Sequence, residues 1–319
     1  MKQQNKSISN RVFIIIVCTV LSIYALSIIL TLLWGLLSSL KNQYEFMFYQ
    51  NWLGFPTLDE NMLPNSREEF FKLWNYQVIV KNYHYVEEGC RTNYVVNGVW
   101  YRNEAKGGFP MVIVNTFVYT VVGSFLHAFV PAIAAYAVTK FENPVGKFMT
   151  GAALFAMTTP VVGTQASFLT MMRNIGLYDT FWGYLLQKAT FGGMYFFVFT
   201  AYFESMPDSF SEAAEIDGAS YFTILISIII PLTMKMISTV LLIQFINGWN
   251  DYQTAYMYMP THPTVAYAVW YLTTNNASSG GEMVVRIAAA MMLGLPILVA
   301  FIFLKDKMMG NVTMGGLKG

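Results

Sequence analysis

Charged side chains are scarce in this sequence, and their scarcity argues against a soluble protein. Only 12% of the 319 residues are charged, while 55% are hydrophobic and 16% are aromatic. A soluble domain carries about 25% charged residues, so the expected solvent for most of this chain is a lipid bilayer. The formal net charge of +1 gives no reason to expect binding to nucleic acid.

The sequence also lacks the short motifs that carry catalysis, metal binding or nucleotide hydrolysis. It contains no G-x-x-x-x-G-K-[ST], H-E-x-x-H, G-x-S-x-G or C-x-x-C pattern. Cys18 lies in an apolar run and Cys90 in a polar segment, so we expect no disulfide between them. His127 is open to two interpretations, a functional group in the membrane or a neutral hydrogen-bonded side chain. We therefore expect no catalytic residue, no metal site and no cofactor, and hence a protein that is not an enzyme.

Long hydrophobic runs, in contrast, are abundant. A hydrocarbon core of ~30 Å needs roughly 20 apolar residues in a helix. Six runs meet this length, and the proline residues inside several of them are tolerated in membrane helices. The first run is too long for a cleaved signal peptide and is expected to be retained. The runs cover about residues 12–40, 112–138, 148–172, 181–203, 222–246 and 283–304.

Basic residues near the ends of these runs predict the orientation of the chain. Placing both termini in the cytoplasm puts the basic residues of the two tails and of the loop between the second and third runs on one side. The predicted fold class is an all-α polytopic membrane protein with six transmembrane helices and cytoplasmic termini. Its expected parts are an N-terminal tail and first helix (1–40), an extracellular cap (41–109), a five-helix core (110–305) and a cytoplasmic tail (306–319).

The segment 41–109 is polar but rich in aromatic residues, and we predict that it folds as a small external α+β cap. Ser66 and Glu69 fit a capping box at the start of a helix. Asn97 and Gly98 fit the type I′ turn of a β-hairpin over residues 94–101. The cap could meet an external partner or shield a pore mouth, or its aromatics could pack on the helices and the membrane interface. Both interpretations stay open.

Residues 204–221, between the fourth and fifth runs, carry the most specific local pattern. Ser209 and Glu212 fit a capping box that begins a short helix, and Gly218 fits the left-handed position after its last turn. Ser220 can then cap the following helix, which continues into the membrane. The pattern predicts a helix–turn–helix elbow at the cytoplasmic surface.

The composition of this elbow suits contact with another protein. Phe210 and Ile216 offer apolar side chains, and Glu212 offers charge for a basic partner. The small residues Ala213 and Ala214 allow a partner to approach the backbone closely. An ordinary amphipathic connector is the alternative, and spacing alone leaves both interpretations open.

Several motifs, taken in order, resemble the permease subunits of binding-protein-dependent ABC importers, in the carbohydrate branch called the maltose-permease-like family. The resemblance covers about residues 110–319, whereas residues 41–109 depart from the family pattern in length and aromatic content. The segment Glu212-Ala213-Ala214-Glu215-Ile216-Asp217-Gly218-Ala219, followed by Ile230-Pro231-Leu232, is similar to the family's EAA loop. Supporting motifs are Asn115-Thr116, Ala134-Ala135-Tyr136-Ala137, the turn from Asn174 to Thr180, Trp249-Asn250-Asp251 and the C-terminal Gly315-Gly316-Leu317-Lys318-Gly319.

The resemblance implies a set of partners and a mechanism. Two permease chains, often non-identical, would form the pathway, two ABC ATPase subunits would each grip one EAA loop, and an extracellular solute-binding protein would deliver a carbohydrate. By the same resemblance Glu212 would pair with a basic residue of the ATPase. The implied coupling residues are Glu212, Ala213, Ala214, Ile216, Asp217, Gly218 and Ala219, and the implied tail contacts are Gly315, Gly316 and Lys318.

Polar residues in or near the apolar runs are the candidates for a pore lining. They are Asn115, Gln165, Gln244 and Asn247, and hydrogen bonding between helices is the alternative role for each. An ion-driven transporter would need carboxylates deep inside a run, and a membrane enzyme would need clustered His, Asp or Glu, and neither is found. A membrane scaffold or receptor that docks a cytoplasmic partner without transport stays the alternative to a permease.

Overall fold

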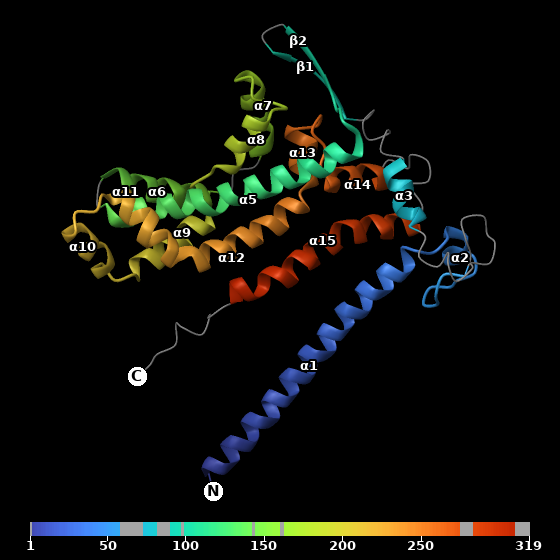
Figure 1. The fold of residues 1–319 in the computed structure, drawn as a ribbon, viewed down its shortest axis with the longest axis horizontal. Coiled ribbons are helices and arrows are strands. Elements are labelled where there is room, and N and C mark those ends of the chain that lie inside the picture. Colours follow the sequence, from blue (N-terminus) through green and yellow to red (C-terminus); the bar gives the residue numbers. More distant parts are fainter. Residues whose placement is uncertain are drawn as a thin grey trace. The chain divides into compact units, whose positions relative to one another are not determined.

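The computed structural model describes residues 2–57, 73–81, 90–96, 99–141, 144–159, 163–274 and 283–309. These residues form helices and one two-stranded antiparallel sheet (Figure 1). The chain divides into two compact units, Met1–Asn82 with Leu272–Gly294, and Tyr83–Tyr271 with Leu295–Gly319. Each unit is described below by itself.

Four helical segments are long and apolar enough to cross a membrane, and they correspond to the first, second, fifth and sixth expected runs. The fifth run contains a π-helical turn just before Pro231, whose missing N–H interrupts the α-helical hydrogen-bond pattern. The segments are Arg11–Ser38 of α1 (Lys2–Ser38), α5 (Gly108–Lys140), Tyr221–Trp249 built from α11 (Tyr221–Ile224), η1 (Leu225–Ile229) and α12 (Ile230–Trp249), and Met283–Ile302 of α15 (Met283–Met309).

The third and fourth runs were expected to be uninterrupted helices, and this expectation is wrong. Each run folds as two shorter helices. Gly163 precedes the second helix of one pair with φ +84°, and Gly193 precedes that of the other with φ +137°. Such backbone angles favour glycine and end a helix. The pairs are α6 (Pro144–Thr158) with α7 (Thr164–Asn174), and α8 (Phe181–Lys188) with α9 (Met194–Glu204).

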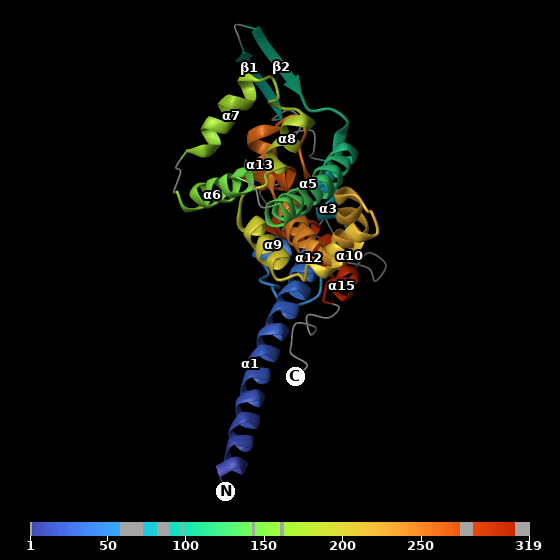
Figure 2. The same ribbon diagram turned by 90° about the vertical axis from the view of Figure 1, so that its left-hand side faces the viewer.

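Helix α5 is the centre of the second unit and packs against α12, α9, α8 and α6 (Figure 1, Figure 2). Its buried alanines follow helical spacing and face buried phenylalanines of α9 in one apolar cluster. Small side chains on one helix let a neighbour approach closely, and here they leave room for aromatic rings. The alanines are Ala128, Ala132 and Ala135, and the phenylalanines are Phe196, Phe199 and Phe203.

The predicted β-hairpin is confirmed by strands β1 (Arg91–Val96) and β2 (Val99–Glu104). Val96 pairs with Val99, so the connection has the two-residue length predicted, although residues 97 and 98 themselves lie outside the described residues. Tyr94 meets Tyr178 edge to face with ring centres 4.8 Å apart. The hairpin is therefore fastened to the turn that joins α7 to α8.

A buried carboxylate, Asp179, holds this end of the second unit together. It accepts hydrogen bonds from the side chain of Asn103 (3.0 Å) and from the backbone N–H (3.1 Å) and hydroxyl (2.7 Å) of Thr261. His262 lies 3.5 Å from the same carboxylate. These contacts join the hairpin, the α7–α8 turn and the loop between α13 (Tyr252–Tyr258) and α14 (Val265–Thr274).

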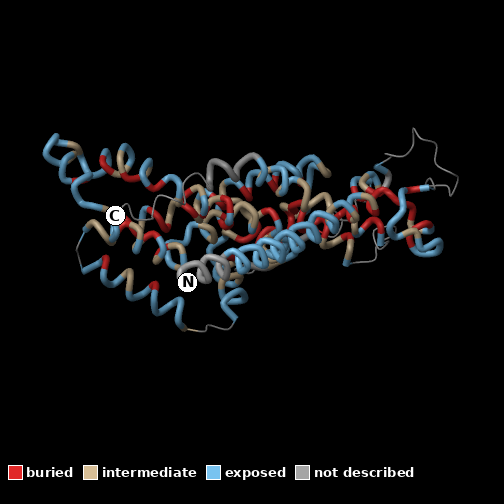
Figure 3. The backbone as a smooth tube through the Cα atoms, turned by 90° about the horizontal axis from the view of Figure 1, so that it is seen from below, coloured by how far each residue is buried: buried red, intermediate tan, exposed pale blue. Residues whose placement is uncertain are grey.

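In the first unit, α1 leads into the short helix α2 (Gln43–Met47), and α3 (Trp74–Lys81) packs beside the junction. The amide of Asn75 donates to the backbone carbonyls of Ser39 (2.6 Å) and Lys41 (2.9 Å). The capping box expected at Ser66 and Glu69 lies outside the described residues. Figure 3 shows most of the described length of α1 as exposed, which is the surface that a lipid-facing helix presents.

Candidate functional site

The elbow predicted at residues 204–221 is present, but it begins differently from the prediction. Helix α10 (Ser209–Ile216) starts after Asp208 and has no side-chain cap. The capping box expected from Ser209 and Glu212 is wrong, because the backbone N–H of Glu212 already donates to the carbonyl of Asp208 (3.0 Å). Asp208 instead approaches Lys140 at the end of α5, at 3.4 Å.

The end of α10 is as predicted. Gly218 has φ +79°, its N–H donates to the carbonyl of Glu215 (3.0 Å), and the N–H of Ala219 donates to that of Ala214 (2.9 Å). This pair of bonds is the Schellman arrangement that closes a helix at a left-handed residue. The hydroxyl of Ser220 accepts from the N–H of Thr223 (3.2 Å) and caps α11. The elbow therefore passes without a loop into α11, η1 and α12.

The predicted coupling residues divide between the surface and the interior. Ile216 is 87% exposed and Phe210 46% exposed, although both side chains are apolar. Ala214 and Ala219 instead pack against the cluster formed by α5, α9 and α12. The remaining coupling residues, Glu212, Ala213, Asp217 and Gly218, are exposed. The elbow is thus anchored on one side and offers an apolar and acidic surface on the other.

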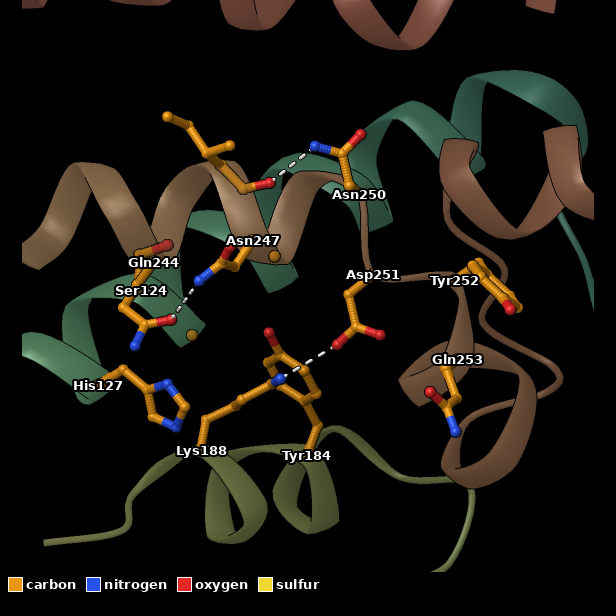
Figure 4. A pocket seen from close by; sticks show the side chains of 13 residues that line it. Ser124, His127, Tyr184, Lys188, Gln244, Asn247, Asn250, Asp251, Tyr252 and Gln253 are labelled. Atoms are coloured by element: carbon orange, nitrogen blue, oxygen red, sulfur yellow. Dashed lines mark hydrogen bonds and ion pairs between the residues drawn. The ribbon is translucent and has the colours of Figure 1, made fainter. Parts of the chain in front are cut away.

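A polar cavity of about 370 Å³ lies at the opposite end of α12 (Figure 4). Its wall includes Gly123, Ser124 and His127, which stand at the middle of α5, so the cavity lies at mid-depth of this spanning helix. Other lining residues come from α8, from α12 and from the start of α13: Tyr184, Lys188, Gln244, Asn247, Asn250, Asp251, Tyr252 and Gln253.

An ion pair crosses one wall of this cavity. The ammonium group of Lys188 lies 3.2 Å from the carboxylate of Asp251, and the side chains are 16% and 24% exposed. Lys188 ends α8, and Asp251 also caps α13 by accepting from the N–H of Thr254 (2.9 Å). Figure 4 shows the imidazole of His127 beside Lys188. The pair therefore joins two interrupted parts of the helical core around a space lined with hydrogen-bonding groups.

Two of the four predicted pore residues lie together in this cavity. Gln244 and Asn247 both line it, and their side-chain amides are 3.5 Å apart. Gln165 lies on α7, where its amide accepts from Gln253 at 3.4 Å. Asn115 is buried and donates to the carbonyl of Pro263 (3.2 Å), so its interhelical role is the one observed. The predicted tail contacts Gly315, Gly316 and Lys318 lie outside the described residues.

Sequence reasoning missed the ion pair. Lys188 and Asp251 are separated by 63 residues, and nothing in their spacing predicts that they meet. The available signal was an ionisable residue within an apolar run, which in membrane proteins is a candidate functional group with a partner to be found.

Comparison with known proteins identifies the family. The family model described as "Binding-protein-dependent transport system inner membrane component" matches residues 108–305, which is more than half of the chain. The match includes the elbow and the cavity.

Individual proteins agree with this match. The chain is 27% identical over 250 residues to the "Trehalose transport system permease protein SugB" of Mycobacterium tuberculosis, covering 77% of this chain and 91% of that protein. It is 27% identical over 210 residues to the "Maltodextrin transport system permease protein MdxG" of Bacillus subtilis, covering 64% and 74%.

A solved structure shares the fold. It is described as a bacterial ABC transporter involved in the import of the acidic polysaccharide alginate. The TM-score is 0.66 at 22% identity, over 93% of this chain and 97% of that one. The chain therefore belongs to the family of inner-membrane components of binding-protein-dependent transport systems, and it is a multi-pass protein of the bacterial plasma membrane.

Proposed function

We propose that this chain is the transmembrane permease subunit of an ATP-driven ABC importer, forming half of the pathway for a sugar or oligosaccharide. The observation that carries the proposal is that the elbow and the cavity stand at the two ends of one continuous helical segment. That segment, Tyr221–Trp249, has 29 residues. At a rise of ~1.5 Å per residue it spans roughly 40 Å, which is enough to link a cytoplasmic surface to the middle of the membrane and beyond.

In this proposal the elbow receives the movement of an ATPase subunit. Ile216 offers an apolar side chain that no described residue covers, and Glu212 offers a carboxylate for a basic residue of the partner. The sequence holds no phosphate-binding loop, so nucleotide hydrolysis would come from two separate ATPase subunits. The tail residues Gly315, Gly316 and Lys318 remain proposed contacts with the same subunits.

The cavity would be part of the saccharide pathway. Sugar hydroxyls both donate and accept hydrogen bonds, and the amides of Gln244 and Asn247 with the Lys188–Asp251 pair supply both kinds of partner. Substrate sites of membrane transporters commonly lie near the midplane, next to interrupted helices. The names of the relatives, trehalose and maltodextrin permeases, support a carbohydrate as the substrate class.

The proposal also sets the topology and the partners. Six crossings, with the third and fourth each made from two helices, put both termini in the cytoplasm and the β-hairpin outside. The hairpin and its surroundings would then face an extracellular solute-binding protein. A second, non-identical permease chain would complete the pathway and cover part of the apolar surface of the helices.

The test is co-purification of the tagged chain with a candidate partner permease and the cell's sugar-importer ATPases, followed by an ATPase assay. We expect the native chain to recover ATPase activity and Glu212→Lys to lose at least about tenfold of it, because reversing a charge at an interface costs several kcal/mol. Glu204→Lys is the matched control, since Glu204 is exposed at the end of α9 outside the coupling set.

Each outcome decides between the two functions. Loss with both variants, or with neither, would contradict the coupling role of Glu212. Recovery of no ATPase by the native chain, with its helices intact by circular dichroism, would favour a scaffold or receptor that docks another cytoplasmic partner.

A further inference from the structure

The segment that follows α1 buries its charges and exposes its aromatic side chains. Lys41 and Glu45 are 0% and 1% exposed. The ammonium group of Lys41 donates to the carbonyl of Asn51, and Glu45 accepts from the side chain of Asn51 and from the backbone N–H and hydroxyl of Thr57 (both 2.8 Å). Charged residues are almost never fully buried unless they are paired in this way.

The outside of the same segment is apolar. We call this surface the aromatic face. Among residues 42–57 the charged residue is Glu45, which is buried, so the aromatic face carries no formal charge. Its side chains, with their exposed fractions, are Met47 (53%), Phe48 (74%), Tyr49 (73%), Trp52 (53%), Leu53 (84%) and Phe55 (66%).

This arrangement is the reverse of a water-exposed loop. Burying apolar surface contributes about 25 cal/mol per Å², and contiguous exposed patches of large apolar side chains mark a surface that meets lipid or another protein. Even the one polar group of Trp52 is used internally, because its indole N–H donates to the carbonyl of Phe46 (3.0 Å). What Trp52 shows to the outside is therefore hydrocarbon.

Position and composition together favour lipid over protein as the neighbour. The aromatic face begins directly after Arg11–Ser38, a span with none of its most apolar window buried, so it continues a surface that already faces lipid. Polar groups satisfied from within are what a lipid environment requires. Trp and Tyr concentrate at the membrane–water boundary, whereas a surface that selects a soluble partner would carry charge at its rim.

We propose that residues 43–57 form an interfacial anchor, in which the aromatic face lies among the lipid headgroups and upper acyl chains at the end of α1. The buried cluster of Lys41, Glu45, Asn51 and Thr57 holds the segment in the shape that presents this face. The anchor fixes where α1 leaves the bilayer, and it does so independently of transport and of any partner subunit.

The test uses single cysteines in the full chain reconstituted in liposomes, with Cys18→Ser and Cys90→Ala removing the native thiols. Phe48→Cys and Leu53→Cys are labelled separately with an environment-sensitive fluorophore. Both residues point outward, so their replacement removes no internal packing. Lipids brominated near the headgroup report contact with the bilayer, and iodide in the buffer reports contact with water.

Two control positions bracket the scale. Leu21→Cys on the exposed surface of α1 gives the lipid-facing limit, and Asn93→Cys on β1 gives the water-facing limit. We expect quenching by brominated lipid at both test positions within about twofold of Leu21→Cys, and iodide quenching about fivefold weaker than at Asn93→Cys.

Two other outcomes would overturn the anchor. Strong iodide quenching without lipid quenching would mean that the aromatic face lies in water. Protection from both quenchers, or protection that arises only when partner subunits are added, would mean that a protein covers it.

Discussion

The two ends of the helical segment Tyr221–Trp249 are built in opposite ways. At one end the elbow exposes apolar Ile216 and Phe210, and backbone hydrogen bonds between near neighbours give it its shape. At the other end the cavity gathers polar side chains from four separate stretches of chain, with Lys188 and Asp251 mostly buried. A surface that another protein grips can be made from local sequence, whereas a site for a polar ligand in a membrane needs distant residues that satisfy one another.

The largest expected effect is at the elbow. Gly218→Val places a β-branched side chain at φ +79°, where it is strongly disfavoured by about 1–2 kcal/mol or more. No atom lies near the position of the new Cβ, so the effect comes from backbone strain alone. We expect nucleotide-coupled uptake to fall by at least about tenfold. Gly151→Val in α6 is the control, because its Cβ also meets open space and its φ is ordinary. Wild-type uptake in both variants would contradict the elbow's role as a lever.

The next largest effect is at the cavity and should act on stability. A Cβ at Gly123 would collide with the hydroxyl of Tyr184, which is held by its hydrogen bond to the carbonyl of Tyr119 (2.5 Å). We expect Gly123→Ala to lower the free energy of unfolding by about 1–3 kcal/mol through overpacking. Gly248→Ala lines the same cavity, but its Cβ would sit 3.6 Å from Thr120 in ordinary contact. Thermal unfolding in detergent that treated the two variants alike would contradict the packing described here.

The ion pair of the cavity provides a third comparison. Lys188→Ala leaves the carboxylate of Asp251 mostly buried without its cation, and we expect a loss of about 1–3 kcal/mol. Arg102→Ala removes a pair with the same kind of geometry, 3.1 Å from Glu104, but the side chains are 68% and 42% exposed. An exposed pair contributes about 0–1 kcal/mol because water screens it. Equal melting temperatures for the two variants would show that burial at the cavity is less than described.

The smallest effect is on pH dependence at the hairpin end of the second unit. Burial raises the pKa of Asp179, but hydrogen bonds from His262, Asn103 and Thr261 outweigh it and hold the pKa below its usual value. A depressed carboxyl pKa gives stability that is complete above the unfolded value of about 3.9 and is lost as the pH falls through the folded value. Melting temperatures measured from neutral pH to below pH 4 should therefore fall more steeply for the native chain than for Asp179→Asn. Parallel curves would contradict an ionised Asp179 at neutral pH.

Local pattern predicted the elbow well because its determinants are neighbours in sequence. The left-handed position of Gly218 and the cap at Ser220 were both predicted, and the error at Ser209 came from a helix that begins after Asp208. The interruptions at Gly163 and Gly193 were missed because the length and apolar character of the third and fourth runs masked them. Length alone tests whether a helix can cross a bilayer, and it does not test whether the backbone stays helical throughout.

The sequence by itself determined that this chain belongs in a membrane, which segments are apolar, where the hairpin turns and how the elbow ends. Each of these properties depends on residues a few positions apart, through periodicity, capping and backbone angles. Only the tertiary structure decided that Gln244 and Asn247 share a cavity while Asn115 does not, that Lys188 meets Asp251, and that Lys41 and Glu45 are buried beneath an exposed aromatic face. Those outcomes depend on contacts between distant segments, and the pairing of polar groups that lipid cannot hydrate selects them.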